Sequence, residues 1–385
     1  MKRIPYGKQT LGSEEIRAVT RALKSPRITQ GPLVREFEDR LTAYTGAKYA
    51  VAVCNGTAAL HLAYLALGLK PKTDLVTTPL TFSATAAGAV YCGAGLKFAD
   101  ISPETLNLDP ANAFDAADSK TRIIAPVHFA GHPCDMEKIA RLAAKKKAAV
   151  VEDACHALGA SYRAGNRWLK VGSAAHADDC VFSFHPVKAI TTGEGGAITT
   201  NRRDVYEKML VLRSHGMVKK EGWRYEISDI GFNYRITDIQ CALGIVQMKR
   251  LDSFIQKRRQ IASFYDREFK NVSEVQRPPS DDAVKAAYHL YVLRFELGRL
   301  TADRGVVFDE LKKRGIDAQV HYIPLHTQPA YRKYGCKPGD FPVAENYYQR
   351  AVSIPIYPDL KDSERRYVVR AVKDIVLKLK KRSQR

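Results

Sequence analysis

The chain has 385 residues and a formal net charge of +20, from 61 Lys and Arg against 41 Asp and Glu. Because single hydrophobic cores stop growing at about 250–300 residues, we expect a large domain over residues 1–250 and a smaller α+β domain over residues 251–385. No apolar run approaches the roughly 18 residues of a membrane span, and no apolar stretch follows the basic N-terminus as in a secretory signal. The sequence therefore argues against a membrane protein and predicts a cytoplasmic one.

The positive charge leaves two classes of partner open, nucleic acid and a polyanionic small molecule. The densest basic runs (145–147, 312–314 and 378–382) accompany helical patterns, so a solvated surface explains them. No zinc-finger spacing and no RNA-binding strand motif is present. The seven cysteines form no CxxC pair, and we expect no metal site. Nucleic acid is therefore the weaker hypothesis.

Helical and strand patterns alternate over the first two-thirds of the chain. Ser13 is expected to cap a helix that packs through Ile16, Val19 and Leu23. Continuous apolar strands separated by helices predict an α/β fold with a mostly parallel sheet covered on both faces. The expected strands are 49–53, 75–79, 96–100, 122–129, 148–153 and 180–185.

A long helical pattern from Val246 to Phe269 leads out of this region. The smaller domain that follows is expected to contain a strand over 288–296, a helix ending near Gly315, a strand over 316–324 and a closing helix.

Polar groups follow several strands, at the edge where parallel sheets place their ligand sites. Asn55-Gly56-Thr57-Ala58 opens a helix whose N–H groups and dipole suit a phosphate, although a plain turn and cap would look the same. Asp153 ends another strand and would suit a cation, yet a helix cap or a surface ion pair explains it as well. Lys188 follows a buried strand; a lysine in an apolar cleft reacts with aldehydes, but most lysines are surface residues.

Taken together, the motifs resemble a known family. NGTAAL, EDACHALG, FSFHPVK and TTGEGGAITT, with PLTFSATA, LRSHGM, GFNYRITDIQCALG and HYIPLH, are similar in order to the DegT/DnrJ/EryC1/StrS sugar aminotransferases. This family is a branch of the fold-type I enzymes that use pyridoxal 5′-phosphate, and the resemblance covers nearly the whole chain. It implies that fold, that cofactor and a homodimer.

The resemblance also implies roles for individual residues. Lys188 would bond the cofactor covalently and then carry protons, and Asp153 would keep the pyridine nitrogen protonated. His156 would contact the phenolic oxygen, where many relatives carry Gln. The other implied cofactor contacts are Phe82 on the ring, Thr57, Ala58 and Ser183 on the phosphate, and Asn233 on the phosphate of the neighbouring subunit's cofactor.

AGHPCDM, SFHPVKAITTGEGG and VHYIPLHTQPAYRKYG resemble the members of the family that act in pseudaminic acid biosynthesis. Those members transfer an amino group from L-glutamate to a UDP-4-keto-6-deoxy-N-acetylhexosamine. TDP, GDP and other keto sugars stay open, as does the sugar dehydratase reaction of relatives that carry His in place of the lysine. The implied nucleotide-sugar pocket contains Tyr6, Arg27, Ile28, Thr29, Tyr322 and His326.

Overall fold

The computed structural model describes residues 3–381, and its central sheet has seven strands in the order β1-β9-β8-β5-β4-β2-β3. The strands from β8 to β3 are parallel, whereas β9 is antiparallel to both of its neighbours. The predicted mostly parallel α/β fold is confirmed. The strands are β1 (Tyr49–Val53), β2 (Asp74–Thr77), β3 (Gly95–Phe98), β4 (Thr121–Ala125), β5 (Ala149–Asp153), β8 (Asp179–Ser183) and β9 (Gly196–Thr200).

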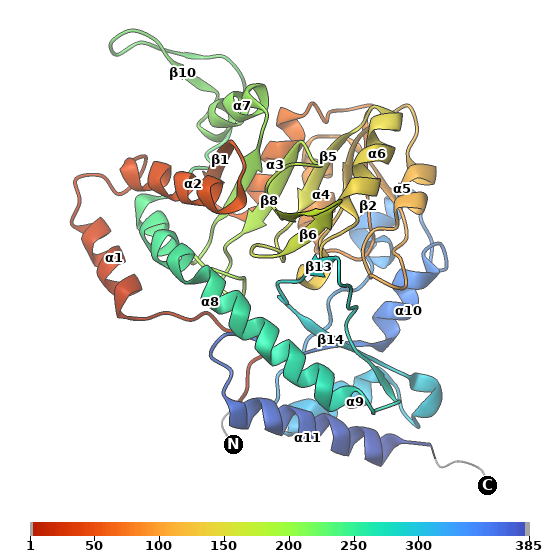
Figure 1. Cartoon of the computed structure of the whole chain (residues 1–385). Helices are drawn as coiled ribbons and strands as arrows, with labels where there is room; N and C mark the ends of the chain where they lie inside the picture. The colour runs from red at the N-terminus through yellow and green to blue at the C-terminus, as the bar shows by residue number, and fades with distance from the viewer. Residues whose placement is uncertain (1–2, 382–385) are drawn as a thin grey trace.

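Helices cover both faces of this sheet (Figure 1). Val151 of β5 belongs to a core that contains α3 and α4, and Val150 belongs to a second core on the opposite face, with α2, α6 and α8. This alternation is the period-2 pattern of a strand buried on both faces. The helices are α1 (Ser13–Leu23), α2 (Pro32–Thr45), α3 (Gly56–Ala66), α4 (Ser83–Tyr91), α5 (Pro110–Ala116), α6 (Met136–Lys146), α7 (Arg203–Arg213) and α8 (Asp238–Phe269).

The helix α1 exposes two of the three side chains that were expected to pack inward, whereas Val19 is half-buried. Ile16 is 67% exposed and Leu23 is 58% exposed, so that part of the prediction was wrong. The helix packs on α8 through Ala18 and Ala22, because small residues let the two backbones approach closely. Its N-cap is Gly12 rather than Ser13.

Two other boundaries and one additional strand differ from what was expected. The strand β4 ends at Ala125, before Pro126, and not at residue 129. The motif TTGEGGAITT contains β9, a strand that was not among the expected ones. The helix α8 begins at Asp238, where Thr237 caps it, eight residues before Val246. The expected domain boundary at residue 250 therefore falls inside α8, and the division into two domains stays a prediction.

The C-terminal part has its own apolar core, which includes Ile4 from the other end of the chain. Residues 316–324 were expected to form a strand and do not; they make only the isolated bridges of Ile316 with Ile4 and of Gln319 with Ser353. This irregular segment carries Tyr322 to the large sheet. The elements here are β12 (Val275–Gln276), β14 (Tyr291–Phe295), β15 (Ala351–Ile354), α9 (Arg304–Lys313), α10 (Pro342–Arg350) and α11 (Asp362–Leu379).

A hairpin of two short strands projects from the body of the molecule beyond α7 (Figure 1). Its tip and base expose Trp223 and Ile230, which are 86% and 82% accessible. Among residues 3–381, none of the helices combines the length and the apolar character that a membrane crossing requires. The remaining strands are β10 (Met217–Lys219) and β11 (Tyr225–Ile227) of the hairpin, and β6 (Ser161–Ala164), β7 (Arg167–Lys170) and β13 (Val284–Lys285) of a small separate sheet.

Candidate active site

A cavity of about 650 Å³ lies at the carboxyl ends of the parallel strands. This is the edge at which open α/β sheets bind their ligands. Most of the residues singled out from the sequence lie in its wall: Tyr6, Thr57, Ala58, Phe82, Asp153, His156, Ser183, Lys188 and Tyr322. Segments that are far apart in the chain are therefore brought together around one space.

Asp153 is the last residue of β5, and its carboxylate is buried. Its Oδ2 accepts a hydrogen bond of 2.6 Å from Thr85 Oγ1, and its Oδ1 accepts one of 3.1 Å from the backbone N–H of Cys155. These two donors stabilise the buried carboxylate and fix its orientation. A carboxylate oxygen can accept more than one hydrogen bond, so Asp153 is still able to meet a cationic ring nitrogen.

Lys188 follows β8 and lies in the same wall. Burial lowers the pKa of its amine, and the neighbouring Cys155 and Asp153 oppose that shift only in part. A lowered pKa raises the fraction of neutral amine, the form that attacks an aldehyde.

The N-terminus of α3 forms a cradle for an anion. Asn55 caps the helix, and its side chain accepts a hydrogen bond of 2.8 Å from the N–H of Ala58. The first N–H groups of a helix have no acceptor within the helix and attract negative charge. A Cβ added to Gly56 would lie 3.0 Å from Cβ of Ser183, so the glycine allows the serine to approach this turn closely. Thr57 and Ser183 adjoin the cradle, whereas the N–H of Ala58 is already used by the cap.

The cavity is also lined by His156, His289 and His321, which together form a histidine wall. Nε2 of His156 lies 3.1 Å from the hydroxyl of Tyr322, and the His156 ring packs on His289 at 4.3 Å between centroids. Burial and the nearby Lys188 place the pKa of His156 well below its usual value and lower that of His321 to about 4. His156 is therefore neutral at pH 7. Its Nδ1 is buried without a hydrogen-bond partner in the described part of the chain.

Five predicted residues lie outside this cavity. Arg27, Ile28, Thr29 and Asn233 are exposed. His326 is fully buried, and its Nε2 lies 2.9 Å from Glu345 Oε1. Within one chain the structure does not bring these five to the cavity, and their proposed contacts with substrate or cofactor stay predictions.

Sequence reasoning did not single out four residues of the site. Thr85 holds Asp153, while His289, His321 and Tyr234 line the cavity. Thr85 lies one helical turn after Phe82, within a motif that the sequence already offered. The two histidines come from the C-terminal part of the chain, and only the tertiary fold places them beside Lys188.

These groups fit pyridoxal phosphate. The orphaned Nδ1 of His156 gives a buried polar partner for the phenolic oxygen, and the α3 cradle gives one for the phosphate. Asp153 suits the ring nitrogen, and Phe82 forms an exposed aromatic wall. Within residues 3–381 no group of three or more His, Cys, Asp or Glu side chains is arranged to hold a metal ion.

Comparison with known proteins gives the family. The model of the DegT/DnrJ/EryC1/StrS aminotransferase family matches residues 9–373. The UDP-4-amino-4,6-dideoxy-N-acetyl-β-L-altrosamine transaminase of Campylobacter jejuni is 40% identical over 98% of this chain and 99% of its own. The GDP-perosamine synthase of Escherichia coli O157:H7 is 32% identical over 97% and 99%.

A solved structure of Helicobacter pylori PseC, described as an aminotransferase of pseudoaminic acid biosynthesis, superimposes with a TM-score of 0.92. It is 32% identical and is matched over 98% of this chain and 100% of its own. The chain therefore belongs to the DegT/DnrJ/EryC1/StrS aminotransferase family and is a pyridoxal-phosphate-dependent aminotransferase.

Proposed function

We propose that this enzyme transfers the amino group of L-glutamate to C4 of a UDP-4-keto-6-deoxy-N-acetylhexosamine. The products would be UDP-4-amino-4,6-dideoxy-N-acetyl-β-L-altrosamine and 2-oxoglutarate, in pseudaminic acid biosynthesis. The observation that carries the reaction class is the presence of Lys188 and Asp153 in one cavity. The names of the C. jejuni and H. pylori relatives support the choice of sugar.

The residues divide the chemistry between them. Pyridoxal phosphate, when bound, supplies an aldehyde and an electron-withdrawing ring. Asp153 keeps the ring nitrogen protonated, and the hydrogen bond from Thr85 holds that carboxylate in place. The Lys188 amine would remove a proton from the α-carbon of glutamate and later deliver one to C4 of the sugar, because burial lowers its pKa and leaves more of it in the neutral form that acts as a base.

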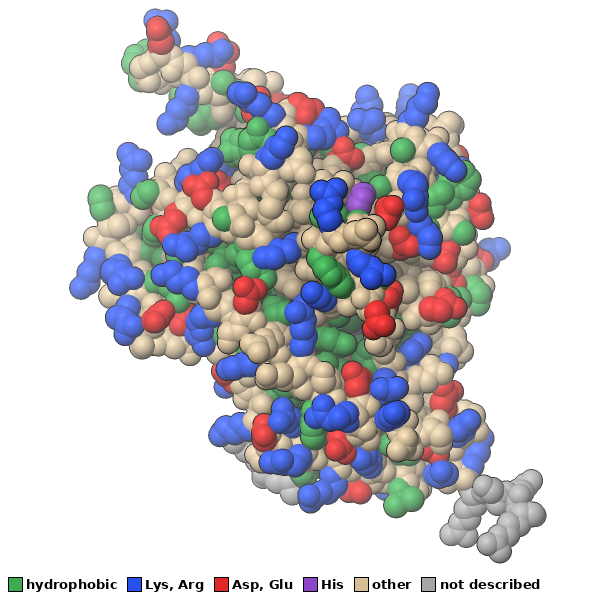
Figure 2. Space-filling view, viewed as in Figure 1, with side chains coloured by type: hydrophobic (Ala, Val, Ile, Leu, Met, Phe, Trp, Pro, Cys, Tyr) green, Lys and Arg blue, Asp and Glu red, His purple; other side chains and the backbone are tan. Residues whose placement is uncertain are grey.

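The nucleotide sugar would enter beside Tyr6 and Tyr322, which lie in the cavity wall. We extend the proposal to Arg27, Ile28, Thr29 and His326 as further contacts with this substrate. Basic and acidic side chains are interspersed over the face shown in Figure 2, which favours a small polyanion over nucleic acid as the partner of this basic protein.

The proposal includes a homodimer in which Asn233 reaches the cofactor phosphate of the other subunit. Asn233 is exposed here and lies next to Tyr234, a residue of the cavity wall. Ile16, Leu23 and Trp223 are also exposed, and exposed apolar surface of this kind is typical of subunit contacts. Free cysteines at all seven positions suit the reducing cytoplasm, where we place the enzyme.

The test offers glutamate and UDP-, TDP- and GDP-linked 4-keto sugars to the purified enzyme with pyridoxal phosphate. We expect 2-oxoglutarate and the amino sugar in equal amounts, with the UDP-N-acetylhexosamine substrate preferred. Lys188→Ala should abolish turnover, whereas Lys145→Ala, at an exposed position, should not change it. Loss of a sugar oxygen without an amino product would favour the dehydratase, and turnover by Lys188→Ala would refute the assignment.

A mixing experiment tests the shared site. Subunits with Lys188→Ala and subunits with Asn233→Ala should each lack most activity alone. After unfolding and refolding together, the mixed dimer has one site with an intact Lys188 and an intact Asn233 from the other chain, so activity should reappear. If Asn233 acted within its own chain, no site in the mixture would be intact.

A further inference from the structure

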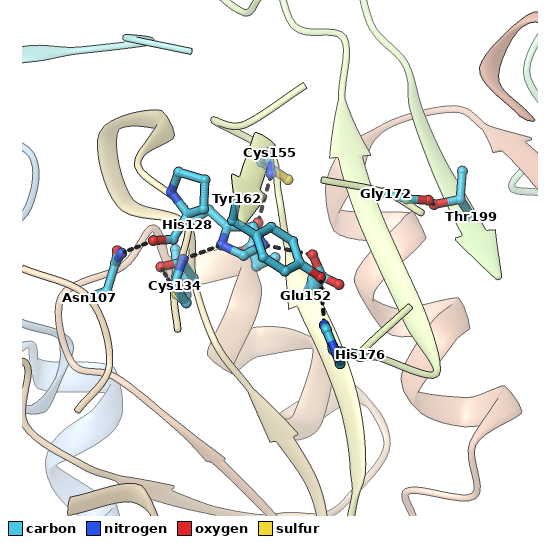
Figure 3. Close-up of polar contacts among 12 residues, drawn as sticks. Asn107, His128, Cys134, Glu152, Cys155, Tyr162, Gly172, His176 and Thr199 are labelled. Atoms are coloured by element: carbon cyan, nitrogen blue, oxygen red, sulfur yellow. Dashed lines mark hydrogen bonds and ion pairs between the residues drawn. The ribbon is translucent and has the colours of Figure 1, made fainter. Parts of the chain in front are cut away.

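His128 and Glu152 form a buried pair directly beside Asp153, and no step described above uses them. His128 Nε2 lies 2.8 Å from Glu152 Oε2, and the two side chains are 0% and 1% exposed. A charged carboxylate at this depth is costly unless donors meet it. Figure 3 shows the imidazole of His128 between Cys134 and Glu152.

The backbone determines which nitrogen of His128 carries the proton. Nδ1 accepts a hydrogen bond of 2.9 Å from the N–H of Cys134, so Nδ1 has no hydrogen of its own. Nε2 therefore carries the proton and donates a hydrogen bond to Glu152. The imidazole thus joins the loop at Cys134 to the end of β5 through two directed hydrogen bonds.

Glu152 and Asp153 are consecutive on β5, so their side chains lie on opposite faces of the sheet. Asp153 faces the cavity, and Glu152 faces the core that contains α6 and α8. The backbone closes the arrangement, since the N–H of His128 donates to the carbonyl of Asp153 at 3.1 Å and the N–H of Asp153 donates to Pro126 at 2.8 Å. These two backbone hydrogen bonds join residue 153 to the segment 126–128 and restrict rotation of its peptide groups.

The loop held by His128 also touches the histidine wall. A Cβ added to Gly131 would lie 2.7 Å from the carbonyl oxygen of His156 and 3.1 Å from the amide nitrogen of His289. Gly131 has φ +88°, so a side chain there would be strained as well. Asn107 ties the same loop down through bonds of 3.0 Å to His132 and 3.1 Å to Pro133. Displacement of His128 would therefore reach both His156 and Asp153.

We propose that His128 and Glu152 are positioning residues that orient the Asp153 carboxylate toward the cofactor ring nitrogen. The inference rests on the role of Asp153 in the proposed function. The pair touches neither substrate nor cofactor; it acts through the backbone of β5 and the loop 128–134. A displacement of a reacting group by about 1 Å costs on the order of 100-fold in rate, so small shifts here have large effects.

Two substitutions at position 128 separate the two hydrogen bonds. Asn places an acceptor near Nδ1 but does not reach Glu152, whereas Gln places a donor near Nε2 but leaves the N–H of Cys134 without its partner. Pyridoxal phosphate is titrated into each purified apo-protein and followed by its absorption. We expect His128→Asn to raise the cofactor Kd about tenfold or more and to lower kcat, while KM for glutamate changes by no more than about twofold. In His128→Gln, most of the cofactor affinity and most of kcat should be retained.

Thr199→Val is the matched control. It removes another buried hydrogen bond of the same sheet, 2.8 Å from Thr199 Oγ1 to the carbonyl of Gly172, which lies apart from His128 and Glu152 (Figure 3). Thermal midpoints show whether the variants lose similar stability. If His128→Asn binds the cofactor as tightly as Thr199→Val does, the positioning role is overturned.

Glu152→Gln covers the case in which His128→Asn does not fold. It keeps the volume and an acceptor but removes the charge, so the bond to His128 weakens and the cofactor Kd should rise several-fold; an unchanged Kd would overturn the proposal.

Asp153→Ala distinguishes a failure of this inference from a failure of the proposed function. If Asp153→Ala leaves the cofactor Kd unchanged, the assigned role of Asp153 is wrong. If Asp153→Ala weakens cofactor binding but the substitutions of His128 and Glu152 do not, the role of Asp153 stands and only the positioning role of the pair is refuted.

Discussion

The hydroxyl of Tyr322 lies 3.1 Å from Nε2 of His156, and this contact joins the C-terminal part of the chain to the end of β5. Burial raises the pKa of Tyr322 well above its usual value, so its phenol stays protonated at pH 7. The neutral imidazole of His156 has one donor and one acceptor nitrogen, and the hydroxyl complements either. The contact therefore fixes the His156 ring and leaves Nδ1 for the cofactor.

Removing this hydroxyl should weaken cofactor binding. In Tyr322→Phe the His156 ring loses the partner of Nε2, and Nδ1 has none within the described chain. A hydrogen bond of this kind contributes about 1 kcal/mol, so the Kd for pyridoxal phosphate should rise about fivefold. Absorption titration of the apo-protein measures it. Tyr331→Phe, which removes a tyrosine hydroxyl bound to the carbonyl of Ser83, should leave the Kd unchanged.

Thr85→Val should weaken cofactor binding more strongly. Valine has nearly the same shape as threonine, but Asp153 loses the 2.6 Å donor to Oδ2. Hydrogen bonds to charged groups contribute on the order of 2 kcal/mol, which predicts a rise of more than tenfold in the cofactor Kd. Thr77→Val is the control, because it removes a buried 2.7 Å bond to Ala125 in the same sheet without touching Asp153. Equal effects of the two variants would contradict the assigned role of Thr85.

The histidine wall should make the protein less stable in acid. Burial lowers the pKa of His289 well below 6.5 and that of His321 to about 4. Between the folded pKa and 6.5, the unfolded chain binds protons that the folded chain does not, so the free energy of unfolding falls as the pH falls through this window. The slope is up to about 1.4 kcal/mol per pH unit for each group. Thermal midpoints of apo-protein from pH 7.5 to 4.5 should fall less steeply in His289→Gln than in the unmodified chain; identical slopes would contradict this.

Asp179→Asn should stabilise the protein at neutral pH. Asp179 is fully buried, and burial raises its pKa to about 8, although the Thr200 hydroxyl opposes that shift. The folded state therefore retains a proton that the unfolded chain releases above pH 3.8, and this difference reduces stability as the pH rises toward 8. Asparagine has no proton to release, so this difference disappears, and we expect the free energy of unfolding at pH 7 to rise by about 1 kcal/mol or more.

The neighbouring Asp178 supplies the opposite control. Its Oδ2 accepts from the N–H of Val150 at 2.9 Å, and its Oδ1 accepts from Arg202 at 2.9 Å. Asp178→Asn should therefore lower the thermal midpoint. A gain in stability from both substitutions would show that the buried position of Asp179 is not the cause.

The sequence by itself determined the features that depend on short stretches of chain. Apolar strands followed by polar residues, such as Asn55 and Asp153, identified the sheet and its ligand-binding edge, because strand patterns and helix caps are local. The order of motifs identified the family, and with it Lys188. The expected packing of α1 was wrong because its hydrophobic spacing does not reveal that a second helix, α8, accepts only its small residues.

Only the tertiary structure decided which side chains complete the site. Thr85 is 68 residues from Asp153, and Tyr322 is 166 residues from His156, so no local pattern links either pair. The neutral state of His156 likewise follows from burial against Lys188 and His321. Charge, desolvation and hydrogen-bond partners depend on distances in space, and the fold sets those distances by closing the C-terminal part of the chain over the ends of the parallel strands.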